Sequence, residues 1–178
     1  MTIKFSLPPV VPKQPPLPVA EPPVARNDIR LTSLLENRYQ EDLEGLMFFN
    51  PQQKKALAGI SRSIKDFGIP SVFPEGERLR IKVEGLPEAQ AIFALEHRVD
   101  PPELIGVMVF VRLDPENLVL LHIAVREDYS RGGKHGDEML VARFVGELRT
   151  IARRIRGVRH VILKYSGGLM IPVDPAAG

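Results

Sequence analysis

The sequence predicts a mixed α/β (α+β) fold in which helices cover both faces of a mostly antiparallel sheet. Residues 27–70 repeat apolar side chains at helical spacing, whereas residues 78–117 carry short apolar runs separated by turn residues. Residues 118–164 then comprise a buried strand, a glycine-containing basic turn, a long amphipathic helix and a further strand. A strand–helix–strand connection of this kind places its two strands parallel in one sheet.

Composition narrows the class of protein. The chain has 178 residues and a net charge of +2, and this weakly basic balance does not by itself indicate nucleic acid. The absence of cysteine excludes disulfides and thiolate metal sites. No apolar run approaches the roughly 20 residues needed to span a membrane, and prolines interrupt the N-terminal stretch where a signal peptide would need an apolar core. We therefore expect a cytoplasmic protein without a membrane segment.

The chain divides into an arm and one domain. Residues 1–26 contain eight of the 17 prolines and are typical of extended polyproline II structure. Two interpretations stay open: a disordered leader, or an arm that docks onto a protein partner. Residues 27–178 are expected to form a single domain, helical over 27–70 and built from a sheet and the helix after the glycine turn over 78–165.

Two helices are expected in the first part of the domain. Asn27 or Asp28 would cap the first, and Pro51 would occupy the first position of the second. The second ends at Gly68. Their apolar stripes are Leu31, Leu34, Leu35, Tyr39, Leu43, Leu46 and Met47 for the first, and Ala56, Leu57, Ile60, Ile64 and Phe67 for the second.

Five strands are expected after them. Residues 79–83 alternate apolar and polar side chains, which is typical of a half-exposed strand. Further strands cover 90–97, 104–112, 118–125 and 158–164. The turn residues 114–117 predict that the third and fourth strands are antiparallel neighbours.

The turn after the fourth strand predicts a phosphate site. Gly132, Gly133 and Gly136 allow the backbone to adopt positive φ and to lie close to a ligand. A helix beginning directly behind such a turn offers free amide groups and a positive dipole end. The expected helix carries one apolar stripe, made of Leu140, Phe144, Leu148, Ile151 and Ile155.

Three features together resemble the GCN5-related N-acetyltransferase (GNAT) superfamily over roughly residues 79–165. They are the order of elements, the stretch HIAVREDY at 122–129, and the glycine-rich basic turn. The family's cofactor loop has Gln or Arg, two residues, Gly, one residue, then Gly or Ala. Counting from Arg131 keeps the last glycine, Gly136, but puts Lys134 in the middle position; counting from Ser130 keeps Gly133 in the middle but puts His135 last. We adopt the first alignment, in which Gly136 adjoins the helix.

The resemblance implies an acyl-CoA N-acyltransferase-like fold that binds acetyl-CoA. The pantetheine would pair with the strand backbone at Ile123, Ala124 and Val125. The pyrophosphate would lie on the turn formed by Arg131, Gly132, Gly133, Lys134, His135 and Gly136.

The implied reaction is acetyl transfer to an unidentified amine. His122 would relay a proton, and its alternative is a packed core histidine. Glu127 and Glu96 are further candidate bases, or else solvated surface acids. Tyr165 would protonate the departing thiolate.

A second reading is a catalytically inactive GNAT scaffold that docks into a larger assembly through residues 1–26. The family continues after its fifth strand with a helix and two more strands, which residues 166–178 cannot supply. If the protein is an enzyme, we expect the fourth and fifth strands to splay apart and the amides of the turn to be unpaired. If it is a scaffold, we expect side chains or the arm to fill the cleft between these strands.

The last helix and its exit carry several arginines, namely Arg143, Arg149, Arg153, Arg154, Arg156 and Arg159. They form either a face for nucleic acid or an acidic partner, or a solvated helix face. No aromatic residues are interleaved for base stacking, so the sequence argues against nucleic acid.

Overall fold

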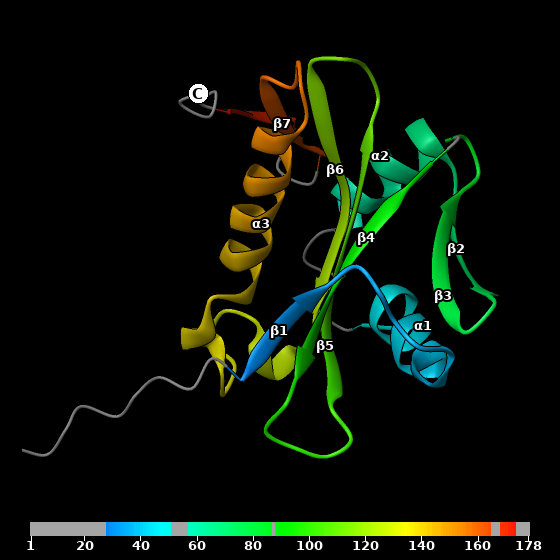
Figure 1. Ribbon diagram of the computed structural model, residues 1–178, viewed down its shortest axis with the longest axis vertical. Helices are drawn as coiled ribbons and strands as arrows, with labels where there is room; N and C mark the ends of the chain where they lie inside the picture. The colour runs from blue at the N-terminus through cyan, green and yellow to red at the C-terminus, as the bar shows by residue number, and fades with distance from the viewer. Residues whose placement is uncertain (1–27, 51–56, 87, 165–167, 174–178) are drawn as a thin grey trace, which may run out of the picture.

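The computed structural model describes residues 28–50, 57–86, 88–164 and 168–173, which form a mixed α+β fold around a six-stranded sheet (Figure 1). The strand order is β1-β4-β5-β6-β7-β8, and β6 and β7 are the parallel pair in an otherwise antiparallel sheet. The strands are β1 (Ile29–Thr32), β4 (Gln90–Glu96), β5 (Glu103–Arg112), β6 (Asn117–Val125), β7 (His160–Leu163) and β8 (Leu169–Pro172). The proline-rich arm, the helix start predicted at Pro51 and the candidate acid Tyr165 lie outside the described residues.

Both faces of the sheet are covered, as the sequence predicts. Helix α3 (Leu140–Arg154) lies on one face (Figure 1). On the other lie α1 (Gln40–Phe48), α2 (Leu57–Phe67) and a separate hairpin of β2 (Pro70–Glu75) and β3 (Arg78–Val83). The α3 side is packed by Ile105, Met108, Phe110, Phe144 and Leu148, and the α1 side by Leu43, Met47, Ile81, Val107 and Val109.

The central strands have continuous apolar sequences because both of their faces are buried. Every residue of β5 from 104 to 111 is buried, and only the terminal Glu103 and Arg112 are exposed. The turn Asp114–Asn117 connects β5 to β6 as an antiparallel pair, since the Asp114 carboxylate accepts from the backbone amides of Glu116 and Asn117 at 2.8 and 2.9 Å. The predicted hairpin and the parallel β6–β7 pair are both confirmed.

Helix α3 lies close to the sheet because β5 has a glycine beneath it. A Cβ at Gly106 would stand 2.8 Å from Phe144 Cε2 and 3.1 Å from Leu140 Cδ2. Leu140, Phe144 and Leu148 are fully buried and Ile151 is partly buried against the same core, so the predicted apolar stripe is confirmed over these residues. Ile155 also packs against this core, but it is the C-cap residue beyond the end of the helix. Among the described residues, no helix has the length and apolar character needed to cross a bilayer.

The first predicted helix is wrong at its beginning. Residues Ile29–Thr32 form strand β1, which pairs with Phe93–Glu96 of β4, so no helix begins at these residues and Asp28 precedes a strand; Asn27 lies outside the described residues. The helix begins only at Gln40, after a 3-10 turn at Asn37–Tyr39. A four-residue strand at a sheet edge is held by its partner's backbone rather than by its own periodicity, and the spacing of Leu31, Leu34 and Leu35 imitated a helix.

Two further edge strands were not predicted. Strand β2 begins with Pro70 and contains Pro74, and an edge strand tolerates proline because its missing amide faces away from the partner. Strand β8 pairs antiparallel with β7, so the described residues 168–173 supply one strand after the fifth predicted strand.

Candidate functional site

The loop between β6 and α3 differs from a simple glycine turn in front of a helix. The chain makes a 3-10 turn at Glu127–Tyr129 and a second at Gly136–Glu138. Met139 then adopts a left-handed conformation, with φ 49° and ψ 42°, and α3 begins only at Leu140. The expectation that the helix starts directly behind Gly136 is therefore wrong, because the left-handed Met139 separates the loop from the first turn of α3.

The glycines serve the loop's own folding. A Cβ at Gly133 would lie 2.4 Å from the Glu127 carbonyl oxygen and 2.6 Å from that of Asp128. A Cβ at Gly136 would lie 2.8 Å from the Ser130 carbonyl oxygen. Close approach of backbone to backbone thus explains these two glycines without a ligand.

Part of the backbone expected to hold phosphate is already bonded within the loop. The amide of Gly133 donates to Ser130 at 2.9 Å, that of His135 to Asp128 at 2.7 Å, and that of Gly136 to Gly133 at 3.1 Å. The amides of Arg131, Gly132 and Lys134, in contrast, donate to no described residue. Half of the six amides between Arg131 and Gly136 are therefore open, and the turn is not a full cradle.

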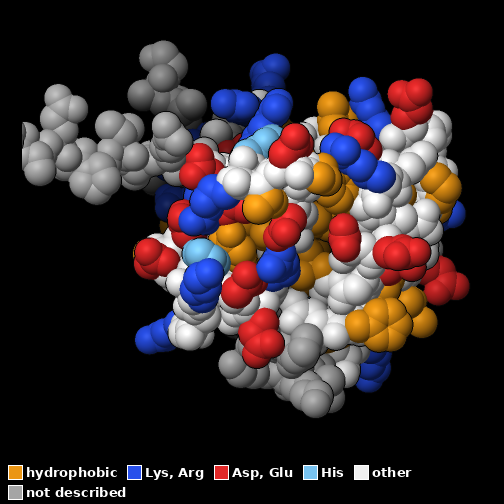
Figure 2. Space-filling view, turned by 90° about the horizontal axis from the view of Figure 1, so that it is seen from below, with side chains coloured by type: hydrophobic (Ala, Val, Ile, Leu, Met, Phe, Trp, Pro, Cys, Tyr) orange, Lys and Arg blue, Asp and Glu red, His pale blue; other side chains and the backbone are white. Residues whose placement is uncertain are grey.

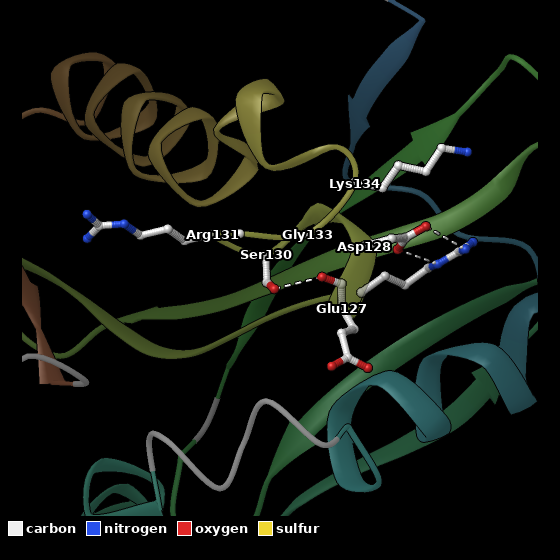
Figure 3. Close-up of a pocket in the computed structure, with 8 residues that line it drawn as sticks. Glu127, Asp128, Ser130, Arg131, Gly133 and Lys134 are labelled. Atoms are coloured by element: carbon white, nitrogen blue, oxygen red, sulfur yellow. Dashed lines mark hydrogen bonds and ion pairs between the residues drawn. The ribbon is translucent and has the colours of Figure 1, made fainter.

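An open pocket of about 610 Å³ lies on the outer side of this loop. Its described lining comprises Arg126, Glu127, Asp128, Ser130, Arg131, Gly132, Gly133 and Lys134. In Figure 3, the side chains of Arg131 and Lys134 point in opposite directions, and that of Glu127 points away from both. Within the described part of the chain, Arg131 and Lys134 form no ion pair, so their charge is available to an anion.

Arg126 forms ion pairs within the protein, so its charge is already neutralised by neighbouring carboxylates. It contacts Asp128 at 3.0 Å and Glu103 at shorter range, which ties the loop to the start of β5. Figure 2 shows acidic and basic side chains interspersed over this end of the molecule. Local ion pairs of this kind position the loop and do not create a field of one sign.

A hydrogen-bonded network supports the inner side of the loop, in which Glu96 and Tyr129 are buried and Arg98 is partly exposed. The Tyr129 hydroxyl donates to Glu96 Oε2 at 2.5 Å, and Arg98 Nη2 donates to the same oxygen at 2.6 Å. Arg98 also approaches Glu138 at 3.6 Å. The Tyr129 and His135 rings stack with centroids 4.9 Å apart, so His135 packs inward rather than toward a ligand.

Strands β6 and β7 separate before β6 ends. Their parallel pairing runs from Asn117–His160 to Leu120–Leu163 and stops there, while β6 continues to Val125. Residues 122–125 thus pair with β5 on one side and have no β7 partner on the other, and Leu121 lies at a register shift, opposite no β5 residue. The structure therefore has the open splay between these two strands that the enzyme interpretation of the sequence predicts.

Described side chains occupy two points of that open edge. Ser63 Oγ of α2 donates to the Leu121 carbonyl at 3.2 Å, and the buried Asn50 Nδ2 donates to the Val125 carbonyl at 2.7 Å. Ile123 lies between them and is half-buried, whereas Ala124 packs into the core on the α1 side. Of the three residues expected to face the pantetheine, Val125 therefore already has a partner on its carbonyl.

The candidate bases lie in different places. His122 is buried beside a small apolar pocket, and desolvation lowers its pKa to about 4, so it is neutral at pH 7. Glu127 lines the loop pocket instead. Glu96 is neither a solvated acid nor an available base: it is buried, and the hydrogen bond from Arg98 lowers its pKa to about 2. Tyr165 lies outside the described residues.

Sequence reasoning missed Asn50 and the role of Tyr129. Asn50 directly precedes Pro51, the predicted first residue of the second helix, and Tyr129 is the last residue of the HIAVREDY stretch. Both act over long sequence separations, Asn50 on Val125 and Tyr129 on Glu96, and a local pattern carries no signal for such pairs. The described residues contain no group of three side chains that would hold a metal ion.

Comparisons with known proteins give little beyond this geometry. No protein-family model matches the chain, and no curated protein matches it. A crystal structure of an acetyltransferase from Streptococcus agalactiae 2603 is similar over 76% of this chain and 72% of that chain, at 14% identity and a TM-score of 0.37. Because the TM-score and the identity of this match are low, the function of the chain is inferred from its own residues.

Proposed function

We propose that the protein is a GNAT-like N-acetyltransferase that binds acetyl-CoA and transfers its acetyl group to an amine. The observation that carries the proposal is the end of β6–β7 pairing after Leu120, which leaves an open strand edge leading directly into the 126–134 loop pocket. An open edge of this kind takes an extended amide-bearing arm as an added strand. The parallel strand pair joined through a loop and a helix is also what the GNAT resemblance implies.

The residues present can hold the two parts of such a donor. The backbone around Ile123 would pair with the pantetheine, between the contacts that Ser63 and Asn50 make with the strand. The amides of Gly132 and Lys134, with the cationic side chains of Arg131 and Lys134, would bind the pyrophosphate. Gly133, His135 and Gly136 would shape the loop rather than donate to phosphate.

His122 would handle the proton of the amine. Acetyl-CoA would supply an activated thioester, so that a carbon–nitrogen bond forms as the carbon–sulfur bond breaks. His122 is neutral at pH 7, and a neutral imidazole accepts a hydrogen bond or a proton. Because the pKa of His122 is only about 4, the protonated imidazole would be short-lived and would transfer the amine proton to the departing thiolate. Glu127 as a second base and Tyr165 as the acid belong to the same proposal.

A second candidate function is an inactive scaffold of the same fold that docks onto a partner through residues 1–26. The internal hydrogen bonds of the loop and the Asn50 contact on Val125 favour it, because both use backbone groups that a bound donor would need. The two candidates differ in whether acetyl-CoA binds at all.

The test is calorimetric titration of the full chain with acetyl-CoA. The Arg131→Glu substitution should weaken binding by about tenfold or more, because a charge-assisted contact to phosphate becomes a repulsion. Arg153→Glu, an exposed arginine on α3, serves as the matched control and should change the dissociation constant by less than about twofold. Absence of binding at millimolar acetyl-CoA would exclude the enzyme and leave the scaffold.

A further inference from the structure

A second pocket, apolar in character, lies beside the open part of β6. Its volume is about 180 Å³, and it is separate from the charged loop pocket. Its lining comes from α1, α2, β3, β5 and β6 and includes Met47, Ile60, Val83, Val109, Leu121 and His122. Among the described lining residues, Ser63 and His122 are the polar side chains, and Ser63 already donates to the Leu121 carbonyl.

Three large apolar side chains around this pocket are partly exposed. Phe48 is 37% exposed, Ile64 38% and Ile69 61%, and all three belong to its lining. Exposed apolar side chains gathered at one hollow, rather than scattered singly, mark a site that an apolar group covers. Their arrangement indicates that the pocket opens to solvent between α2 and the start of β2.

The size of the pocket limits what it can hold. A cavity of about 150 Å³ lined by Leu, Ile and Phe accommodates benzene. A space of about 180 Å³ with a similar lining therefore suits one aromatic ring or one branched alkyl chain. We propose that this pocket binds an apolar substituent of that size on the acceptor amine, so that the substrate is an aryl-alkyl or branched alkyl amine.

The position of the pocket connects it to the reaction, and this step rests on the proposed function. Leu120 is the last residue of β6 that pairs with β7, and the pocket is lined by the next two residues, Leu121 and His122. An amine whose apolar group fills the pocket would have its nitrogen near His122 and near the strand edge proposed for the donor. The polar loop pocket begins at Arg126, four residues further, or about 13 Å along an extended strand.

The experiment compares two amines on the full chain without acetyl-CoA. The dissociation constants of 2-phenylethylamine and ethylamine are measured by calorimetry for the wild type, Ser63→Leu and Ser63→Ala. The aromatic amine should bind the wild type at least about tenfold more tightly than ethylamine, because only it buries a ring. Ser63→Leu fills the pocket and should remove that preference. Ser63→Ala loses the same hydrogen bond without filling the space, and should keep the preference within about threefold.

The amine titrations test the pocket independently of acetyl-CoA binding. Equal affinity for the two amines, or equal binding by Ser63→Leu and Ser63→Ala, would overturn the pocket assignment. A second experiment titrates the protein with acetyl-CoA and isovaleryl-CoA. If the wild type prefers the longer acyl group, Ser63→Leu abolishes that preference and neither amine is preferred, the pocket binds the acyl chain of the donor. That result would overturn the proposal that the pocket binds the acceptor amine. Since the amine titrations contain no CoA, they stand even if acetyl-CoA fails to bind. Should Ser63→Leu not fold, Ile69→Asp at the exposed rim replaces it, and an unchanged amine preference in that variant counts against the pocket.

Discussion

Glu96 lies on β4 but holds the loop that follows β6. Its carboxylate accepts hydrogen bonds from Arg98 and from Tyr129, and the pKa of Glu96 falls to about 2 chiefly because of the Arg98 contact. Burial, together with the neighbouring carboxylate, raises the pKa of Tyr129. A buried carboxylate with these partners stays charged and fixes the geometry of the loop.

Replacing Glu96 should therefore lower stability in a pH-dependent way. The folded-state pKa of about 2 lies below the ordinary value of 4.5, so the stability it contributes is present above pH 4.5 and is lost as the pH falls through 2. Glu96→Gln should lower the free energy of unfolding by about 2–3 kcal/mol at pH 7, and this difference should shrink below pH 4.5. Urea denaturation of the wild type and the variant at pH 7, 4 and 3 measures the loss of stability at pH 7 and its decrease at lower pH.

Glu103→Gln is the control for that measurement. Glu103 pairs with Arg126 at the surface, and its side chain is 50% exposed, so its loss should cost less than about 1 kcal/mol. An equal effect of the two substitutions would show that the Glu96 network is no more important than a surface ion pair.

At the scale of elements, the loop between β6 and α3 depends on one glycine more than on the others. A Cβ added at Gly133 would clash with the carbonyl oxygens of Glu127 and Asp128, whereas a Cβ at Gly132, where φ is +88°, would meet no atom within 4 Å. The element is therefore shaped by backbone packing at Gly133 and by chain reversal at Gly132.

Gly133→Ala should destabilise the protein by about 2 kcal/mol or more, since neither facing carbonyl can move away cheaply. It should also weaken any acetyl-CoA binding, because the loop pocket changes shape. Gly146→Ala in α3 is the matched control: no atom lies within 4 Å of its added Cβ, and alanine is the better helix former, so stability should rise by about 0.5–1 kcal/mol. Thermal or urea unfolding compares the pair, and a neutral Gly133→Ala would contradict the packing described for the loop.

At the scale of the whole molecule, stability is concentrated in the centre of the sheet. Strand β5 is buried on both faces and paired on both edges, and β6 shares that environment between Leu118 and Leu120, where it pairs with both β5 and β7. The β2–β3 hairpin has only its own two strands, and its second strand is exposed on alternate residues. Opening the hairpin thus exposes much less apolar surface than opening the central strands.

Native-state hydrogen exchange should reproduce this order. Amides of β5 and of β6 between 118 and 120 should exchange only through global unfolding, whereas those of β2 and β3 should exchange faster by at least about tenfold. Equal protection of the hairpin and the central strands would mean that the hairpin belongs to the same cooperative unit.

Much of the central architecture could be predicted from the sequence. The apolar runs of β5 and β6, the Asp114–Asn117 turn and the 3.6-residue stripe of α3 each carry their signal within a few neighbouring residues. The order of these elements required the parallel β6–β7 pair. The residues assigned to acetyl-CoA stay a proposal, and Tyr165 lies outside the described part of the chain.

Contacts between residues that are distant in the sequence could be known only from the tertiary structure. Strands β1, β2 and β8 are short edge strands, stabilised by the backbone of a neighbour rather than by their own pattern. The burial of Glu96 against Tyr129 and the contact of Asn50 with Val125 join residues 33 and 75 positions apart. The sequence by itself determined which residues alternate, repeat or turn, because those depend on local geometry; which side chains meet across the sheet depended on the packed fold.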